Sequence, residues 1–408
     1  MSKFLFTNLW TDDLGLPTRT VPIASELAKR GHHVTFCNPA PSPTKIIKQA
    51  GFENVIPSLQ HFPTIFAPMT PHMWNMDHGA AMGGYLDEAF VRDSVEVLTK
   101  LMDDVDAVVD SWNLSACMAA RISKKPLVSI IQADMHPSNR GLIWWREPPD
   151  DIPTPVPVVN KVLSDYGLPQ VNTVAELHVG DLTLCVGIPE TDPIPETEDI
   201  THVGPIFFQT PDAKLPEWIA TFSEGKPLIW VYAGTPRYQS LASVLDSVVV
   251  LQASAAALAD EDVRVVMTTG HQELPDELSP LPDNFRHEFF LPGIALAEKS
   301  DVMIHHGGHG SCMTAVYAGT PAVIIPTISE RESNARRLAS LGVADFLLPE
   351  IDQSGEKRLS AEVLRDKVRE VLSNPLFTQK AGELGKKLRT YGGAAQAAQL
   401  IEDFMVRS

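Results

Sequence analysis

The chain has 408 residues, of which 44% are hydrophobic and 21% are charged, so it is long enough for two globular domains of roughly 150 to 200 residues each. It carries 33 Lys and Arg residues against 51 Asp and Glu residues, which gives a net charge of −18. This acidic balance argues against a protein that binds nucleic acid or an anionic membrane surface, because both attract basic proteins.

The N-terminal region predicts a protein that stays in the cytoplasm. The run MSKFLFTNLW starts with a strand-like pattern and lacks the apolar core and cleavage site of a signal peptide. No segment approaches the roughly 18 uninterrupted apolar residues of a membrane span. The four cysteines are widely separated, which indicates buried thiols rather than a zinc site or a disulfide framework.

The first half of the chain alternates short apolar runs with longer amphipathic runs. KFLFTNL reads as a strand, TVPIASELAKRG as a helix closed by Gly31, and HHVTFCN as a second strand. DAVVD and KPLVSIIQ continue as buried strands, with the helical run LSACMAARIS between them. The proline-rich stretch at residues 146–159 reads as a long loop.

The same alternation restarts after a segment that is rich in proline and acidic residues. KPLIWVYAGT, VRVVMTTG, SDVMIHHGG and PAVIIP read as strands, each followed by a helical pattern. Two tandem α/β units are the simplest account. We therefore predict one domain over residues 1–204, an extended linker over 205–224, a second domain over 225–385 and a terminal helix over 386–408 that packs back toward the first domain.

The loop HHGGHG connects the predicted strand DVMI to the predicted helix SCMTAVYAG. Its glycines allow a diphosphate to approach the backbone, and Ser311 stands where a helix N-cap belongs. His306 can donate a hydrogen bond to a phosphate oxygen. An acidic chain can thus hold an anion without a cluster of lysines.

This loop belongs to a longer ordered signature. It reads strand, H-x-G-G-x-G-[ST], helix, G-x-P, a strand that ends in proline, and then an acidic residue with a polar neighbour, two further residues and Asn-Ala. That signature resembles the donor-binding motif of the UDP-glycosyltransferase superfamily. The resemblance implies an α/β protein of the GT-B class with two Rossmann-like domains facing a central cleft, and an inverting sugar transfer of the type found in bacterial natural-product biosynthesis.

The resemblance also implies roles for individual residues. The donor, a UDP-sugar or a dTDP-sugar, would be a co-substrate, with no other cofactor and no metal ion. Its diphosphate would contact the first loop of the second domain and the glycine-rich loop, its base would face an apolar wall, and its sugar hydroxyls would contact the pair Glu330 and Arg331. The expected contacts of the diphosphate are Gly234 and Thr235 on one side and His306, Gly308, Gly310 and Ser311 on the other. The expected contacts of the base are Pro292 and Ile294, and those of the sugar are Glu330 and Arg331.

Several positions depart from the family pattern. Thr314 stands where many relatives carry a glutamate for the ribose hydroxyls. Arg331 replaces a neutral amide, so either the donor sugar is modified or carboxylated, or Arg331 forms a solvated ion pair with Glu330 or Glu332.

The catalytic base is the largest departure. Relatives carry a histidine or aspartate after a glycine where this chain has Leu16, although Asp110 matches the acid that orients that base. Either Asp12 or Asp13 serves as base, or the acceptor needs little deprotonation, or transfer is slow. Of the two aspartates we favour Asp13 as the general base.

The acceptor is expected to be a small apolar or aromatic molecule bound by the first domain. Two proline-broken segments rich in Met and aromatic residues suit an adaptable apolar pocket, and their candidate contacts are Trp74, Met76, Trp144 and Trp145. The pattern leaves open a homodimer, a non-catalytic nucleotide-sugar-binding helper and a nucleotide-sugar epimerase of the same fold class.

Overall fold

The computed structural model describes residues 1–208, 214–237, 243–270, 272–352 and 356–407. The chain forms two compact units. Unit 1 comprises residues 1–69, 73–208 and 391–408, and unit 2 comprises residues 70–72 and 209–390. The predicted linker at 205–224 includes residues 209–213, which lie outside the described residues.

Unit 1 is built on a seven-stranded sheet in which every neighbouring pair is parallel. Its strands, in spatial order, are β3 (Glu53–Val55), β2 (His33–Cys37), β1 (Lys3–Asn8), β4 (Ala107–Ser111), β5 (Leu127–Ile131), β6 (Leu182–Cys185) and β7 (Thr201–His202). The central strands read as continuous apolar runs because helices cover both faces of a parallel sheet. The two tandem α/β units predicted from the sequence are thereby confirmed for this half.

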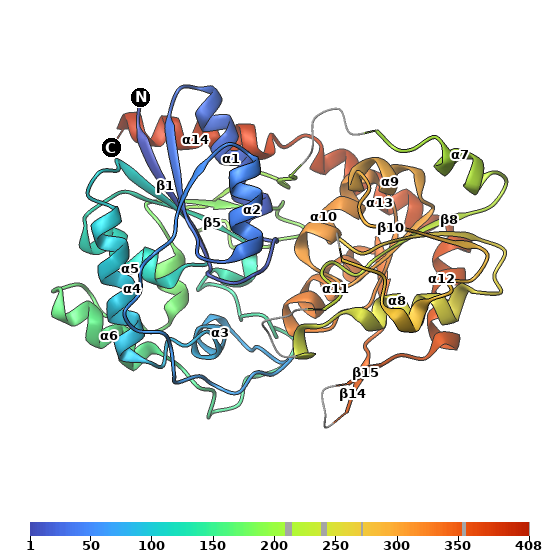
Figure 1. Ribbon diagram of the computed structural model, residues 1–408, viewed down its shortest axis with the longest axis horizontal. Coiled ribbons are helices and arrows are strands. Elements are labelled where there is room, and N and C mark those ends of the chain that lie inside the picture. The colour runs from blue at the N-terminus through green and yellow to red at the C-terminus, as the bar shows by residue number, and fades with distance from the viewer. Residues whose placement is uncertain (209–213, 238–242, 271, 353–355, 408) are drawn as a thin grey trace. The chain divides into compact units, whose positions relative to one another are not determined.

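The helices of unit 1 are α1 (Pro17–Lys29), α2 (Pro41–Gln49), α3 (Met76–Met82), α4 (Glu88–Leu101), α5 (Leu114–Ile122), α6 (Val156–Asp165) and α14 (Gly393–Arg407), with 3₁₀ turns η1 (Ala133–Met135) and η2 (Val174–His178). Helix α14, from the end of the chain, packs against α1 (Figure 1). Their interface lies over a core that includes Phe4, Phe6 and Phe36, each fully buried. Burying each such ring contributes roughly 1.5 to 3 kcal/mol.

Unit 2 is built on a six-stranded sheet whose neighbouring strands are also all parallel. In spatial order these are β10 (Phe285–Glu288), β9 (Arg264–Thr268), β8 (Leu228–Tyr232), β11 (Val302–His305), β12 (Ala322–Ile324) and β13 (Ala344–Phe346). A small antiparallel pair, β14 (Glu350–Ile351) and β15 (Lys357–Arg358), lies apart from this sheet. The second predicted α/β unit is therefore also confirmed.

The helices of unit 2 are α7 (Trp218–Ser223), α8 (Val248–Leu258), α9 (Gly293–Lys299), α10 (His309–Ala318), α11 (Ser329–Leu341), α12 (Ala361–Ser373) and α13 (Pro375–Leu388), with 3₁₀ turns η3 (Ser243–Leu245) and η4 (Asp276–Leu278). Helix α10 packs against both α9 and α13. The order of the strands reverses at β8, which has β9 on one side and β11 on the other. Ligands of open α/β sheets bind at such reversals, outside the carboxyl ends of the strands.

Three segments differ from the prediction. The expected extended linker contains α7, whose Ile219 is 3% exposed, so part of it is a packed helix. The expected loop at 146–159 includes the first residues of α6, because Pro155 and Pro157 are tolerated at a helix start. The expected terminal helix at 386–408 begins only at Gly393, since residues 386–388 complete α13.

Candidate functional site

Two loops meet at the carboxyl edge of the unit 2 sheet. Gly234 and Thr235 follow β8, while His306 and the glycines after it follow β11. Strands β8 and β11 are neighbours, with Tyr232 paired to His305, so both loops leave the sheet at the same level. The topology thus brings together two segments that are about 70 residues apart in sequence.

The imidazole of His306 lies between two glycines. A Cβ atom on Gly234 would lie 2.7 Å from Cε1 of His306, and one on Gly308 would lie 2.5 Å from its Nε2. Gly234 also has a φ of +71°, a left-handed conformation that favours glycine. The glycines are therefore required to seat the histidine with its Nε2 edge facing the loop. We call His306, Gly234, Gly307, Gly308 and Gly310 the glycine cradle.

The N-terminus of α10 opens onto the glycine cradle. The helix starts at His309 with Gly308 as its N-cap, and no side chain caps it. The prediction that Ser311 is the N-cap is wrong, because its backbone N–H already donates to the carbonyl oxygen of Gly308, 3.0 Å away. Gly310 is exposed, and a Cβ placed on it would meet no atom within 4 Å. Open space thus lies over the positive end of the helix dipole.

His306 is 8% exposed, and its Nδ1 has no hydrogen-bond partner among the described residues. Burial lowers the pKa of His306 well below its usual value, with smaller contributions from Arg331 and His305, while a hydrogen bond to the Tyr232 backbone opposes the shift. Neighbouring His305 accepts a hydrogen bond from the Gly307 backbone at 3.1 Å, and burial lowers the pKa of His305 to about 3. Both imidazoles are therefore neutral near pH 7.

Glu330 and Arg331 lie in the first turn of α11 but have different surroundings. Glu330 is half-buried and accepts a hydrogen bond from Asn334, whose amide also donates to the Gly307 carbonyl at 3.0 Å. Arg331 is 6% exposed, and its guanidinium donates to Thr327 and to the carbonyl oxygen of Leu245. No carboxylate pairs with Arg331 in the described part of the chain. The solvated ion pair considered from the sequence is therefore wrong.

The expected base wall and Thr314 lie together at the next turn of α10. Pro292 is the N-cap of α9, and both Pro292 and Ile294 are half-buried. A Cβ on the intervening Gly293 would lie 3.8 Å from the methyl group of Thr314. The hydroxyl of Thr314 donates to the Gly310 carbonyl at 2.8 Å. Pro292 and Ile294, the expected apolar wall for the base, therefore lie next to α10, one turn beyond its open N-terminus.

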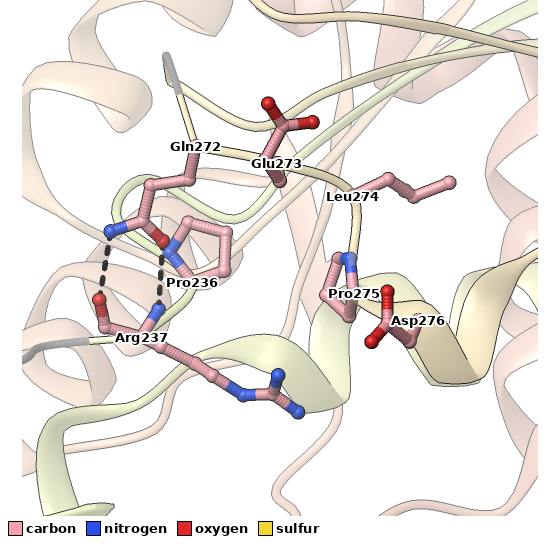
Figure 2. A pocket seen from close by; sticks show the side chains of 7 residues that line it. All are labelled: Pro236, Arg237, Gln272, Glu273, Leu274, Pro275 and Asp276. Atoms are coloured by element: carbon pink, nitrogen blue, oxygen red, sulfur yellow. Dashed lines mark hydrogen bonds between the residues drawn. The ribbon is translucent and has the colours of Figure 1, made fainter.

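Figure 2 shows a hollow that the sequence did not reveal. It is lined by residues that follow β8 and β9: Pro236, Arg237, Gln272, Glu273, Leu274, Pro275 and Asp276. The side chain of Gln272 accepts from the Arg237 N–H at 3.2 Å and donates to the Arg237 carbonyl at 2.8 Å. These bonds connect the loop after β8, which carries Gly234 and Thr235, to the loop after β9. Strand β9 lies on the opposite side of β8 from β11.

In unit 1, the two aspartates after β1 have different environments. Asp12 accepts a hydrogen bond from the Ser42 backbone at 2.7 Å, in the first turn of α2, so it is a structural cap. Asp13 is half-buried, and its Oδ2 lies 3.0 Å from the position that a Cβ on Gly15 would take. Its carboxylate accepts no hydrogen bond from any residue that the structure describes. Of the two, only Asp13 has a carboxylate available for chemistry.

Asp110 is buried and engaged from several sides. Its carboxylate accepts from the Thr7 hydroxyl at 2.6 Å, the Asn113 backbone at 3.1 Å and the Cys117 thiol at 3.4 Å. None of these partners is Asp13, so the expected pairing of Asp110 with a base in the β1 loop is absent within the described residues. Burial raises the pKa of Asp110 to about 7, although these hydrogen bonds oppose the shift.

Asp110, Cys117 and His178 form a cluster whose potential ligand atoms lie within 4.8 Å of one another. The Cys117 sulfur is 3.6 Å from Nδ1 of His178. The thiol donates to the Asp110 carboxyl group, which accounts for the contact between Cys117 and Asp110 without a metal ion. Burial and then the nearby Arg121 guanidinium lower the pKa of His178 to about 4, and that permanent positive charge also disfavours a bound cation. The cluster is best described as a buried polar core.

The raised pKa of Asp110 predicts a pH-dependent stability. The folded state holds this proton up to about pH 7, whereas the unfolded chain loses it near 3.8. The Asp110 contribution is therefore fully present below pH 3.8 and falls by about 1.4 kcal/mol per pH unit as the pH rises toward 7. We expect urea midpoints of the wild type to fall relative to Asp110→Asn between pH 5 and pH 8. Asp103→Asn, at an exposed position, is the control. A difference in urea midpoint between the wild type and Asp110→Asn that stays constant across this range would contradict the raised pKa of Asp110.

Three of the four expected acceptor contacts lie together in unit 1. The backbone carbonyl of Trp74 accepts from the N–H groups of Leu142 and Ile143, at 2.9 and 3.3 Å, which fixes the loop that bears Trp144 and Trp145. The rings of Trp144 and Trp145 meet edge to face, 5.4 Å apart. All three tryptophans are half-buried.

Met76 does not belong with these tryptophans. It is 6% exposed and packs in the core of unit 1, so its expected role in acceptor binding is wrong. It is the first residue of α3, and its side chain is buried.

Comparisons with known proteins agree with this fold. Residues 252–399 match the family model of the erythromycin biosynthesis protein CIII-like C-terminal domain. The 4'-demethylrebeccamycin synthase of Lentzea aerocolonigenes is 34% identical over 205 residues, which cover 50% of this chain and 45% of that protein. The chain thus matches less than half the length of this relative.

Two solved structures match along nearly the whole chain. The calicheamicin glycosyltransferase CalG4 has a TM-score of 0.74 at 23% identity and covers 100% of this chain and 99% of its own. The glycosyltransferase VinC, solved in complex with dTDP, has a TM-score of 0.70 at 21% identity and covers 100% of both chains. At these identities the likeness shows the fold. None of the helices in the described ranges is long and apolar enough to cross a membrane.

Proposed function

This chain belongs to the UDP-glycosyltransferase superfamily and has its GT-B fold, and we propose that it transfers a sugar from a nucleotide diphosphate sugar to a small apolar acceptor, with inversion at the anomeric carbon. The glycine cradle carries this proposal. A neutral histidine seated between glycines, beside an open and uncapped helix N-terminus, is suited to hold a diphosphate.

The proposed reaction is a direct displacement. An acceptor oxygen attacks the anomeric carbon as the bond from that carbon to the diphosphate oxygen breaks. The acceptor proton passes to a carboxylate, and the electron pair of the broken bond leaves with the diphosphate. Backbone N–H groups at the start of α10 and a hydrogen bond from His306 stabilise the charge on the leaving group. This arrangement requires no metal ion.

Thr314 affects which nucleotide, one with ribose or one with 2′-deoxyribose, the proposed site would prefer. A ribose with two hydroxyls is best held by a carboxylate that accepts from both, but Thr314 is neutral and donates its own proton to the Gly310 carbonyl. A 2′-deoxyribose has only one of these two hydroxyls, so it would lose fewer hydrogen bonds than ribose at such a site. The proposed donor is therefore a dTDP-sugar in preference to a UDP-sugar, in keeping with the dTDP found in VinC.

The proposed acceptor binds to unit 1. Trp74, Trp144 and Trp145 offer flat, partly exposed rings on two loops that are hydrogen-bonded to each other. Ring stacking on planar apolar molecules needs little further ordering of such side chains. Asp13 in the same unit is the proposed base. Deprotonation by a carboxylate is most effective on an acidic hydroxyl such as a phenol.

The proposed function predicts product formation in a defined panel. The chain would be incubated with UDP- and dTDP-hexoses, each with and without planar phenolic acceptors, and with or without EDTA. We expect nucleotide sugars to raise the melting temperature, and mass spectrometry to show acceptor plus one sugar, with EDTA making no difference. Turnover of the donor without an acceptor would favour an epimerase. Nucleotide binding without any product across a broad acceptor panel would indicate a non-catalytic protein.

A further inference from the structure

The donor-binding unit has a buried cation next to the glycine cradle. Arg331 is 6% exposed in a chain whose net charge is −18. A buried guanidinium is costly unless its environment compensates it, and its partners here are a hydroxyl and a carbonyl oxygen rather than a carboxylate. The charge of Arg331 is therefore left to act on its surroundings.

The first group of contacts runs from Arg331 to the loop after β8. Its Nη1 donates to the Leu245 carbonyl at 3.3 Å. Two residues later, the Ser247 hydroxyl donates to the carbonyl oxygens of Ala233 and Thr235, at 2.6 and 3.2 Å. Arg331 is thus connected, through the segment 245–247, to the residues on either side of Gly234.

The second group of contacts runs to the loop after β11. Gly307 has a φ of +88°, and a Cβ on it would lie 2.8 Å from the Arg331 carbonyl oxygen and 3.1 Å from the Arg331 Cβ. The first turn of α11 therefore packs directly behind the glycine cradle. Asn334, one turn further along α11, donates to the Gly307 carbonyl and reinforces this contact.

The electrostatic influence of Arg331 reaches the groups that surround the glycine cradle. After burial, its charge is the next cause that lowers the pKa of His306. Burial and then the charge of Arg331 also lower the pKa of Lys357 to about 8, and the charge of Asp246 opposes this shift. Lys357 donates to the carbonyls of Val244 and Asp246, at 2.6 and 2.7 Å. Two cationic side chains, Arg331 and Lys357, therefore donate to neighbouring carbonyl groups of the same short segment, residues 244–246.

We propose that Arg331 is a positioning residue that holds the loop after β8 against the glycine cradle and places a buried positive charge behind the diphosphate, instead of contacting the donor sugar. This inference rests on the proposed function. In a low-dielectric setting a fixed cation attracts a dianion more strongly than at the surface. The charge would also favour departure of the diphosphate, since negative charge on it grows as the bond to the sugar breaks.

The test compares ligands that differ only in phosphate and sugar. Binding of dTDP, thymidine and a dTDP-hexose, and of UDP and uridine, would be measured by calorimetry for the wild type, Arg331→Gln and Arg331→Lys. We expect Arg331→Gln to lower the affinity for the nucleotide diphosphates by about tenfold and the affinity for the nucleosides by less than about twofold. Arg331→Lys keeps the charge and should recover most of the loss.

Arg336→Gln is the matched control. It removes the same charge from the same helix, but at a half-buried position where Arg336 pairs with Glu332 at 2.7 Å. We expect it to leave all the affinities unchanged. Equal losses for diphosphate and nucleoside in Arg331→Gln would overturn the inference, and so would a loss confined to the dTDP-hexose, which indicates a sugar contact. If wild-type protein bound no nucleotide diphosphate, the proposed function would fail before Arg331 was tested.

Discussion

Gly310→Val is expected to reduce affinity for nucleotide diphosphates by roughly a hundredfold while leaving the fold intact. A Cβ at this position meets no protein atom within 4 Å, so the added side chain would project into the open space over the N-terminus of α10, where the proposed diphosphate binds. Weakening the charge-assisted hydrogen bonds at the start of α10 by a total of about 3 kcal/mol corresponds to this hundredfold loss. Calorimetric titration with dTDP and UDP measures the loss directly.

The control for this experiment is Gly382→Val. Gly382 lies in α13 of the same unit, and a Cβ there also meets no atom within 4 Å. Both variants replace a helical glycine, so their effects on melting temperature should be similar. Unchanged nucleotide affinity in Gly310→Val would place the diphosphate elsewhere and remove the basis of the proposed function.

The sequence predicted the framework well because the signals that define it are local. Strands such as DAVVD and PLIWVY are short apolar runs between turn residues, and the structure has β4 and β8 at these positions. Placement of the glycine-rich loop between β11 and α10 was equally accessible, since strand, glycines and helix are consecutive. The N-cap was misplaced by three residues because Ser311 is a good capping type but Gly308 has the required backbone geometry.

The roles of charged residues were harder to predict because their partners are distant in sequence. The partner of Arg331 in η3 is 86 residues away, and nothing near either residue indicates the contact. The same holds for Asp110 and Thr7, which are 103 residues apart. The sequence therefore showed that these positions are unusual, whereas only the packing shows that one guanidinium and one carboxylate are buried.

The most direct test of the chemistry is Asp13→Asn. Asp110 is committed to Thr7, Asn113 and Cys117, and Asp12 caps α2, which leaves Asp13 as the carboxylate in the β1 loop that can accept a proton. Removing a general base lowers a rate by roughly 10² to 10⁴. We expect kcat to fall by that range in Asp13→Asn while dTDP affinity is unchanged, because the glycine cradle belongs to unit 2.

Asp12→Asn separates a base from a structural carboxylate. Its amide oxygen can still accept from the Ser42 backbone, so this neighbouring variant removes the same charge and should retain kcat. Acceptors of graded acidity add a second criterion. If Asp13 accepts the proton, its loss should matter least for the most acidic phenol, since that acceptor is already ionised. Wild-type kcat in Asp13→Asn with every acceptor would mean that the acceptor proton leaves by another route.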